Sequence, residues 1–169
     1  MRLVLVTLLA AVCQAQGNWS YLTYLGGSGS ESIRAVSSDG AGGTFVAGET
    51  YSIGPPFSAQ DPGIRSVPSV FVARIDAAGQ MVFAKVLGDG SASALAVDAD
   101  GNVYVVESYH DYLLVFNRNG ELLLPIGGTG AGIGQFYLPT SVWTDASNRI
   151  FVADMFNGRV AIFQSLADK

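Results

Sequence analysis

The fold of this chain is decided by a stretch that occurs twice. Residues 95–107 read LAVDADGNVYVVE and residues 142–154 read VWTDASNRIFVAD, a spacing of 47 residues. A more distant copy, AVSSDGAGGTFVA, spans residues 35–47. Each copy has a short apolar run, a turn rich in Asp, Gly and Asn, and a second run of β-branched and aromatic residues, which is typical of a hairpin. The sequence therefore predicts a repeat of short strands.

The segments that follow each copy extend the pattern to four strands. Third strands are expected at 70–75, 113–116 and 159–163, and fourth strands at 81–87 and 121–126, after turns rich in Asp, Asn and Gly. Repeats of about 40–50 residues with this content are typical of β-propeller blades. We predict an all-β β-propeller of about three four-stranded antiparallel blades. The blades are expected at about residues 33–88, 94–127 and 141–164.

The two ends of the repeat region complement each other. The third blade stops after Phe163 without an outer strand, and residues 19–25, WSYLTYL, resemble the fourth strand of the first blade. We predict that this N-terminal strand completes the last blade, as in propellers that hide their edges. Closed rings need about four to eight blades. The chain is therefore half of a six-bladed ring closed by a homodimer, a fragment of a longer propeller, or an open arc.

The first 15 residues are typical of a signal peptide. Arg2 precedes an apolar stretch of about ten residues, too short to span a bilayer, and small residues permit cleavage near Ala15. Lipidation at Cys13 and a buried first strand are the alternatives. We expect a secreted or periplasmic protein whose propeller repeats occupy residues 16–169, with no transmembrane segment.

Composition narrows the function. The 169 residues include 14 acidic and 9 basic side chains, for a net charge of −5, and the basic residues are scattered. Nucleic-acid binding is disfavoured because such a surface repels phosphates. The chain has a single histidine and a single cysteine, Cys13, which cleavage would remove.

Two repeat families are similar to parts of the chain. Residues 94–164 resemble NHL repeats through DADGNVYV at 98–105, GGTGAGIGQF at 127–136, Leu138–Pro139 and VADMFNGRVAIF at 152–163. Residues 21–88 resemble SBBP bacterial propeller repeats through YLGG at 24–27, FVAG at 45–48 and FVARID at 71–76. Both resemblances imply a propeller that serves as a binding platform. NHL-like lyases use several histidines around a metal, and this chain has one.

One face of the predicted propeller gathers the loops between second and third strands and the links between blades. The segment 51–69 is the longest of these loops and carries four prolines; long ordered loops are disproportionately functional. Packing over its own blade is the alternative. The aromatic and polar residues of this face are the candidate ligand- or partner-binding set: Tyr51, Phe57, Tyr109, His110, Asp111, Tyr112, Tyr137, Phe156 and Asn157.

The sequence offers no convincing catalytic or metal-binding set. His110 and Asp111 are adjacent in a turn and have no identifiable nucleophile or metal partner. Asp98, Asp100 and Asn102 have the oxygen spacing of a calcium loop but lack its distal Glu, so an Asx turn is the preferred interpretation. Glu107 and Asp154 share a register and are expected to cap neighbouring loops. We expect no cofactor and no metal.

The sequence thus predicts an exported binding or assembly module with an unknown protein or extracellular ligand. A propeller-type lyase or lactonase hydrolase is the alternative from another class. A purely structural assembly unit is the third reading.

Overall fold

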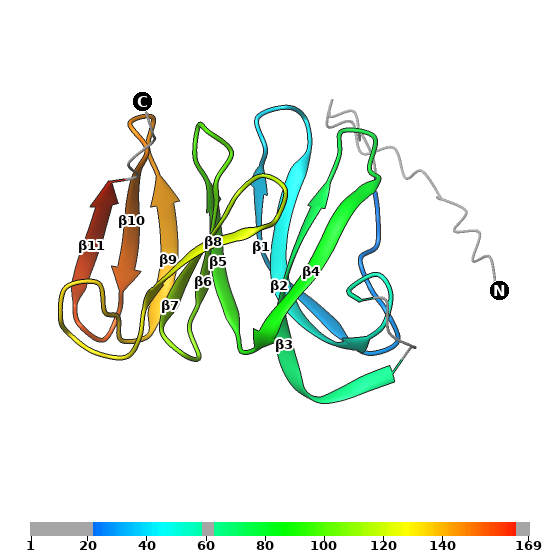
Figure 1. Ribbon diagram of the computed structural model, residues 1–169, viewed down its shortest axis with the longest axis horizontal. Coiled ribbons are helices and arrows are strands. Elements are labelled where there is room, and N and C mark those ends of the chain that lie inside the picture. Colours follow the sequence, from blue (N-terminus) through cyan, green and yellow to red (C-terminus); the bar gives the residue numbers. More distant parts are fainter. Residues whose placement is uncertain (1–21, 59–62, 165–169) are drawn as a thin grey trace, which may run out of the picture.

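The computed structural model describes residues 22–58 and 63–164, which form eleven strands in three antiparallel sheets (Figure 1). The first sheet contains β1 (Glu31–Ser38), β2 (Thr44–Ile53), β3 (Gly63–Ile75) and β4 (Met81–Asp89). The second contains β5 (Ala92–Val97), β6 (Val103–Glu107), β7 (Tyr112–Phe116) and β8 (Leu122–Gly127). The third contains β9 (Pro139–Thr144), β10 (Arg149–Asp154) and β11 (Arg159–Gln164).

Each sheet is a meander whose strands pair in chain order, and the three sheets stand side by side in an arc. The first strands of the sheets are neighbours, β1 beside β5 and β5 beside β9. Figure 1 shows the first sheet (blue to green) at one end of the arc and the third (orange to red) at the other. This arrangement confirms the predicted all-β propeller fold. None of the described residues is helical, and the described part of the chain offers no helix able to cross a membrane.

The third sheet has three strands in the structure. Part of the strand predicted to complete it, residues 19–21, lies outside the described residues, and residues 22–25 belong to no strand. Leu25 instead packs on the first sheet, against a cluster that contains Val46 and Phe71. Among the described residues, the N-terminal segment does not pair with the third sheet of the same chain, because the first and third sheets occupy opposite ends of the arc.

Successive side chains of a strand point to opposite faces of the sheet, so each sheet presents two faces. The core lies where the apolar faces of neighbouring sheets meet. We call the side of a sheet that faces the next sheet its forward face, and the opposite side its rear face. Phe45, Ala47 and Val72 of the first sheet lie on its forward face, and the rear-face residues that meet them in the second sheet include Val105 and Phe116. The forward face of the second sheet packs in the same way on the third: Ala96, Tyr104, Val106, Leu113 and Val115 meet Val142, Ile150 and Val152.

The segment 51–69, predicted as one long loop, is mostly strand. Ser52 pairs with Ile64, and Ile53 pairs with Gly63, so β2 and β3 continue outward beyond the main sheet. The prediction was wrong because prolines suggested an unpaired loop. The register between β2 and β3 shifts between Thr50 and Ser52, which marks a bulge. Because proline has no backbone N–H to donate, it is tolerated beside such a bulge, as Pro68 is here.

The turns that join first to second strands and third to fourth strands share one hydrogen-bonding pattern. In each turn an Asp or Asn Oδ1 accepts hydrogen bonds from the backbone N–H groups two and four residues later, at 2.7–3.0 Å. The five residues are Asp39, Asp76, Asp98, Asn117 and Asp145. Since these bonds occupy amides that no strand partner reaches, they explain why Asp and Asn recur at these positions.

Candidate functional site

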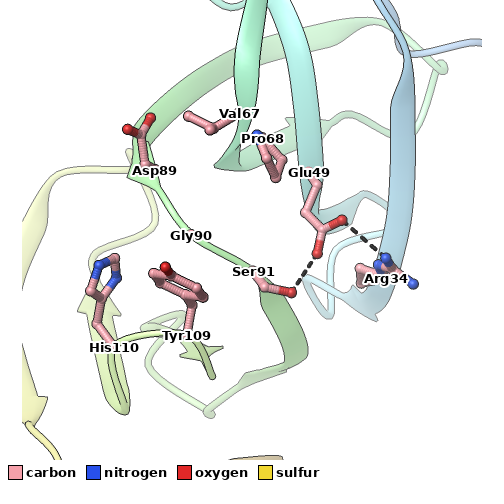
Figure 2. Close-up of a pocket in the computed structure, with 9 residues that line it drawn as sticks. All are labelled: Arg34, Glu49, Val67, Pro68, Asp89, Gly90, Ser91, Tyr109 and His110. Atoms are coloured by element: carbon pink, nitrogen blue, oxygen red, sulfur yellow. Dashed lines mark hydrogen bonds and ion pairs between the residues drawn. The ribbon is translucent and has the colours of Figure 1, made fainter.

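The loops between second and third strands and the links between sheets lie at one edge of the arc, the lower edge in Figure 1. We call this edge the loop face; its described segments are residues 54–58, 90–91, 108–111, 128–138 and 155–158. At this edge a pocket of about 490 Å³ opens between the first and second sheets (Figure 2). Its lining comes from each strand of the first sheet, the following link and the β6–β7 turn: Arg34, Glu49, Val67, Pro68, Asp89, Gly90, Ser91, Tyr109 and His110.

Glu49 is the fixed polar centre of this pocket. Its side chain is largely buried; Oε2 lies 3.0 Å from Arg34 Nη2, and Oε1 accepts a hydrogen bond from Ser91 Oγ at 2.5 Å. Figure 2 shows Asp89 at the other end of the pocket, where its Oδ1 accepts a hydrogen bond from Ser69 Oγ at 3.1 Å. The Tyr109 ring is exposed and meets the His110 ring edge-on, 4.7 Å between centroids. The pocket therefore combines carboxylates, one paired guanidinium and an exposed aromatic face.

Glu107, buried behind this pocket, holds the β6–β7 turn and the link together. Its carboxylate accepts the N–H groups of Ser91, Tyr109 and His110, each at 2.9 Å, and Oε2 lies 3.1 Å from His110 Nδ1. Gly90 has a positive φ of 157°, and a Cβ there would lie 2.6 Å from Glu107 Oε1. The glycine lets the link pass close enough for the carboxylate to bind it.

Asp154, one repeat later, does the same for the third sheet. Its fully buried carboxylate accepts the Tyr137 N–H at 2.7 Å, the Asn157 side-chain amide at 2.8 Å and Arg159 Nε at 2.8 Å. Arg159 also donates to the carbonyls of Ala131, Gly132 and Gln135. These bonds fix the link 128–138 against β11.

The nine candidate residues of the loop face divide into separate groups. Tyr109 and His110 line the pocket. Tyr137 and Phe156 form another aromatic pair, edge-on at 5.1 Å, near the third sheet, and Asn157 is bound to Asp154 and to the Gly130 carbonyl. These three do not line the pocket.

The other four candidates divide between core and surface positions. Phe57 is buried against Phe71, with ring centroids 5.0 Å apart, so this part of the loop packs over its own sheet. Asp111 is buried and accepts hydrogen bonds from Leu138 N–H at 2.8 Å and Thr129 Oγ1 at 2.7 Å. Tyr51 is half-buried in β2, and Tyr112 is exposed at the start of β7. Neither tyrosine lines the pocket in Figure 2.

Sequence reasoning missed Arg34, Glu49 and Asp89. The links between blades are expected from the sequence to lie on the loop face, and the Gly-rich link at 88–93 is one of them, so it could have pointed to Asp89 and Ser91. The contact of Glu49 with Arg34 joins residues 15 positions apart on paired strands, and its contact with Ser91 joins residues 42 positions apart on different sheets. A repeat pattern contains no signal for such contacts.

The calcium candidates are engaged by donors. Asp98 Oδ1 accepts two backbone N–H groups of its own turn, and Oδ2 accepts the Asn102 side-chain amide at 2.9 Å and the Tyr104 hydroxyl at 2.8 Å. Asp100 Oδ2 accepts the Asn148 side-chain amide. A cation at Asp98 would have to displace these donors. In the described ranges no group of three or more His, Cys, Asp or Glu residues is placed to hold a metal ion.

Three aspartates have pKa values below the ordinary 3.8. A hydrogen bond from Arg74, and then one from the Ala41 N–H, lower the pKa of Asp39. The Arg149 backbone N–H lowers the pKa of Asp145. Burial by itself would raise the pKa of Asp154, but the hydrogen bonds from Tyr137, Asn157 and Arg159 more than offset it.

These shifts predict the pH range in which the protein loses stability. Because each folded pKa lies below the unfolded value of 3.8, the stabilisation is complete above that value and is lost as pH falls through the folded pKa values. The melting temperature should therefore stay level down to about pH 5 and fall below about pH 4. Calorimetry from neutral to acid pH measures this. A melting temperature that holds steady below about pH 4 would contradict the assignment.

A family comparison agrees with the architecture. Residues 93–165 match a family described as 6-bladed beta-propeller. A protein of unknown function from Bacteroides caccae has a similar solved structure, with 11% sequence identity, a TM-score of 0.40 and an alignment covering 80% of this chain. The chain spans 61% of the length of that protein. The fold and the family match together define a β-propeller protein.

Proposed function

We propose that this chain is an exported β-propeller module, built of repeats of the NHL and SBBP kinds, that binds a partner through its loop face. The observation that carries the proposal is the pocket between the first and second sheets, which combines Glu49, Asp89 and Tyr109 on one concave surface. Its volume of about 490 Å³ lies within the range of about 300–1,000 Å³ that ligand pockets occupy.

The chemistry of the pocket favours a basic group. Among the side chains that line the pocket, the basic ones are Arg34 and the His110 ring, and Arg34 is paired with Glu49. The exposed carboxylate of Asp89 has no ion pair with Arg34 and can accept a basic group of a partner. An exposed tyrosine ring attracts a cation through its face. A Lys or Arg side chain of a protein partner would place its charge between Asp89 and Tyr109 and its stem against Val67 and Pro68.

Nα-acetyl-arginine amide is a suitable probe for this site. Titration into ¹⁵N-labelled protein should shift the amide resonances of Gly90, Ser91, Tyr109 and His110. Tyr109→Ala should weaken the affinity about two- to fivefold, because a cation–π contact at an exposed site contributes about 0.5–1 kcal/mol. Asp89→Asn should weaken it to a similar degree by removing the charge.

Tyr137→Ala is the matched control, since Tyr137 is an exposed aromatic of the same face that does not line the pocket. Its affinity should equal that of the unmodified protein. Equal shifts from Nα-acetyl-glutamate amide, or an affinity unchanged by Asp89→Asn, would contradict a site selective for basic groups.

The lyase or lactonase alternative has one observation in its favour. Glu107 lies 3.1 Å from His110 Nδ1, and a carboxylate in that place can orient an imidazole for acid–base work. The same carboxylate binds three backbone N–H groups that form the turn and the link. Because turn organisation accounts for Glu107, binding is the function that the geometry supports best.

A further inference from the structure

The forward face of the third sheet repeats the face that the second sheet buries. The 47-residue spacing places its five apolar residues in register with buried residues of the second sheet. Trp143, Phe151, Ala153, Val160 and Ile162 occupy the positions of Ala96, Tyr104, Val106, Leu113 and Val115. Strand pairing sets Phe151 between Trp143 and Ile162, and Ala153 beside Val160. The five side chains therefore form one continuous apolar surface.

This surface is open in the single chain. Val72, Leu113 and Val160 hold equivalent positions in the three sheets, and their exposed fractions are 0%, 1% and 60%. Trp143 and Ile162 are also 60% and 59% exposed, and the Trp143 and Phe151 rings lie 5.2 Å apart. Large contiguous apolar surfaces mark interaction sites. In the first and second sheets of this chain, the equivalent forward face is the one on which the next sheet packs.

The rear face of the first sheet is the matching surface at the other end of the arc. Val36 of β1, Leu95 of β5 and Val142 of β9 hold equivalent positions on the rear faces of their three sheets, since each pairs with the middle of the second strand. Their exposed fractions are 62%, 8% and 8%. Ile33 and Val82 on the same face are also exposed. Leu25 and Phe57 pack against its centre, beside Phe71.

We propose that a second copy of this chain covers both surfaces. The forward face of the third sheet of one copy packs on the rear face of the first sheet of the other, and the contact occurs twice around a twofold axis. Three sheets from each copy then make a ring of six, the number in the description of the family that matches residues 93–165. The same pairing of a forward face with a rear face joins neighbouring sheets in the chain. Because Leu25 and Phe57 cover the centre of this rear face, the partner would contact its exposed residues, such as Val36 and Ile33. Ring closure also leaves no end sheet exposed.

Light scattering coupled to size-exclusion chromatography tests the proposal on the purified protein. The unmodified protein should have the mass of two chains. Ile162→Glu, on the forward face of the third sheet, should give the mass of one chain. Val36→Glu, on the rear face of the first, should do the same, because both contacts need one face of each kind.

Leu123→Glu is the matched control. Leu123 is an exposed apolar residue of β8 in the middle sheet, away from both surfaces, and this variant should remain a dimer. Circular dichroism melting of each variant shows whether it is folded. A monomeric unmodified protein would overturn the proposal. A folded Val36→Glu variant that still dimerises would also overturn it, because the third sheets would then be packing on each other.

Discussion

Replacing Asp154 with alanine should lower the free energy of unfolding by about 3 kcal/mol, because the change leaves buried hydrogen-bond donors without a partner. The carboxylate is fully buried and accepts the Tyr137 N–H, the Asn157 side-chain amide and Arg159 Nε. Once the carboxylate is gone, Arg159 loses the anion that orients it toward the carbonyls of the link 128–138. The link should then become the first site of proteolysis.

Urea unfolding of the variant, followed by tryptophan fluorescence, measures this loss. Arg149→Ala is the control, because Arg149 and Asp145 form an ion pair in the exposed β9–β10 turn, and exposed pairs contribute little to stability. Equal losses in the two variants would show that the buried network does not hold the third sheet. Asp154→Asn should fall between them, since it keeps one oxygen and loses the charge.

Glu107 and Asp154 have a role that extends beyond their own turns. Each ends the second strand of its sheet, and each binds a backbone N–H of the link that leads into the first strand of that sheet, at Ser91 and Tyr137. The carboxylate therefore fixes where the chain enters the sheet. It also fixes the loop face, because Ser91 lines the pocket and Tyr137 belongs to the aromatic pair near the third sheet.

The part of this architecture that repeats could be predicted from the sequence. Strands, Asx turns such as that of Asp98 and the shared register of Glu107 and Asp154 follow from local chemistry at a fixed spacing. The pocket could not be predicted in the same way. Its centre, Glu49, is held by Arg34 from a neighbouring strand and by Ser91 from the link to the next sheet, so it depends on how strands and sheets are placed.

Aromatic residues that look alike in the sequence differ in how deeply the structure buries them. Phe57 and Tyr109 are both aromatic residues of predicted loops, but Phe57 packs on Phe71 and Tyr109 is exposed. Composition and spacing treat them alike. The difference arises because residues 54–58 of the longer β2–β3 connection pack over their own sheet, whereas the β6–β7 turn is too short to do so.

The clearest pair of this kind is Phe136 and Tyr137, which are adjacent in the link before β9. Phe136 is fully buried among Leu113, Val142 and Val152 and meets the Phe163 ring edge-on at 5.9 Å, whereas Tyr137 is exposed. Phe136→Ala should therefore lower the free energy of unfolding by about 3–5 kcal/mol, through lost burial and the cavity left between the second and third sheets.

Tyr137→Ala should lower the free energy of unfolding by about 1 kcal/mol or less, the contribution of one exposed aromatic contact. The two variants remove neighbouring rings of nearly equal size from the same segment, so a difference between them isolates burial. Chemical unfolding of both proteins measures it. Equal losses would mean that the link does not enter the core, and the second and third sheets would then have to be held together by their strands alone. A large loss confined to Phe136 would show that the link fills the space between the second and third sheets with the Phe136 ring, while the Tyr137 ring remains exposed.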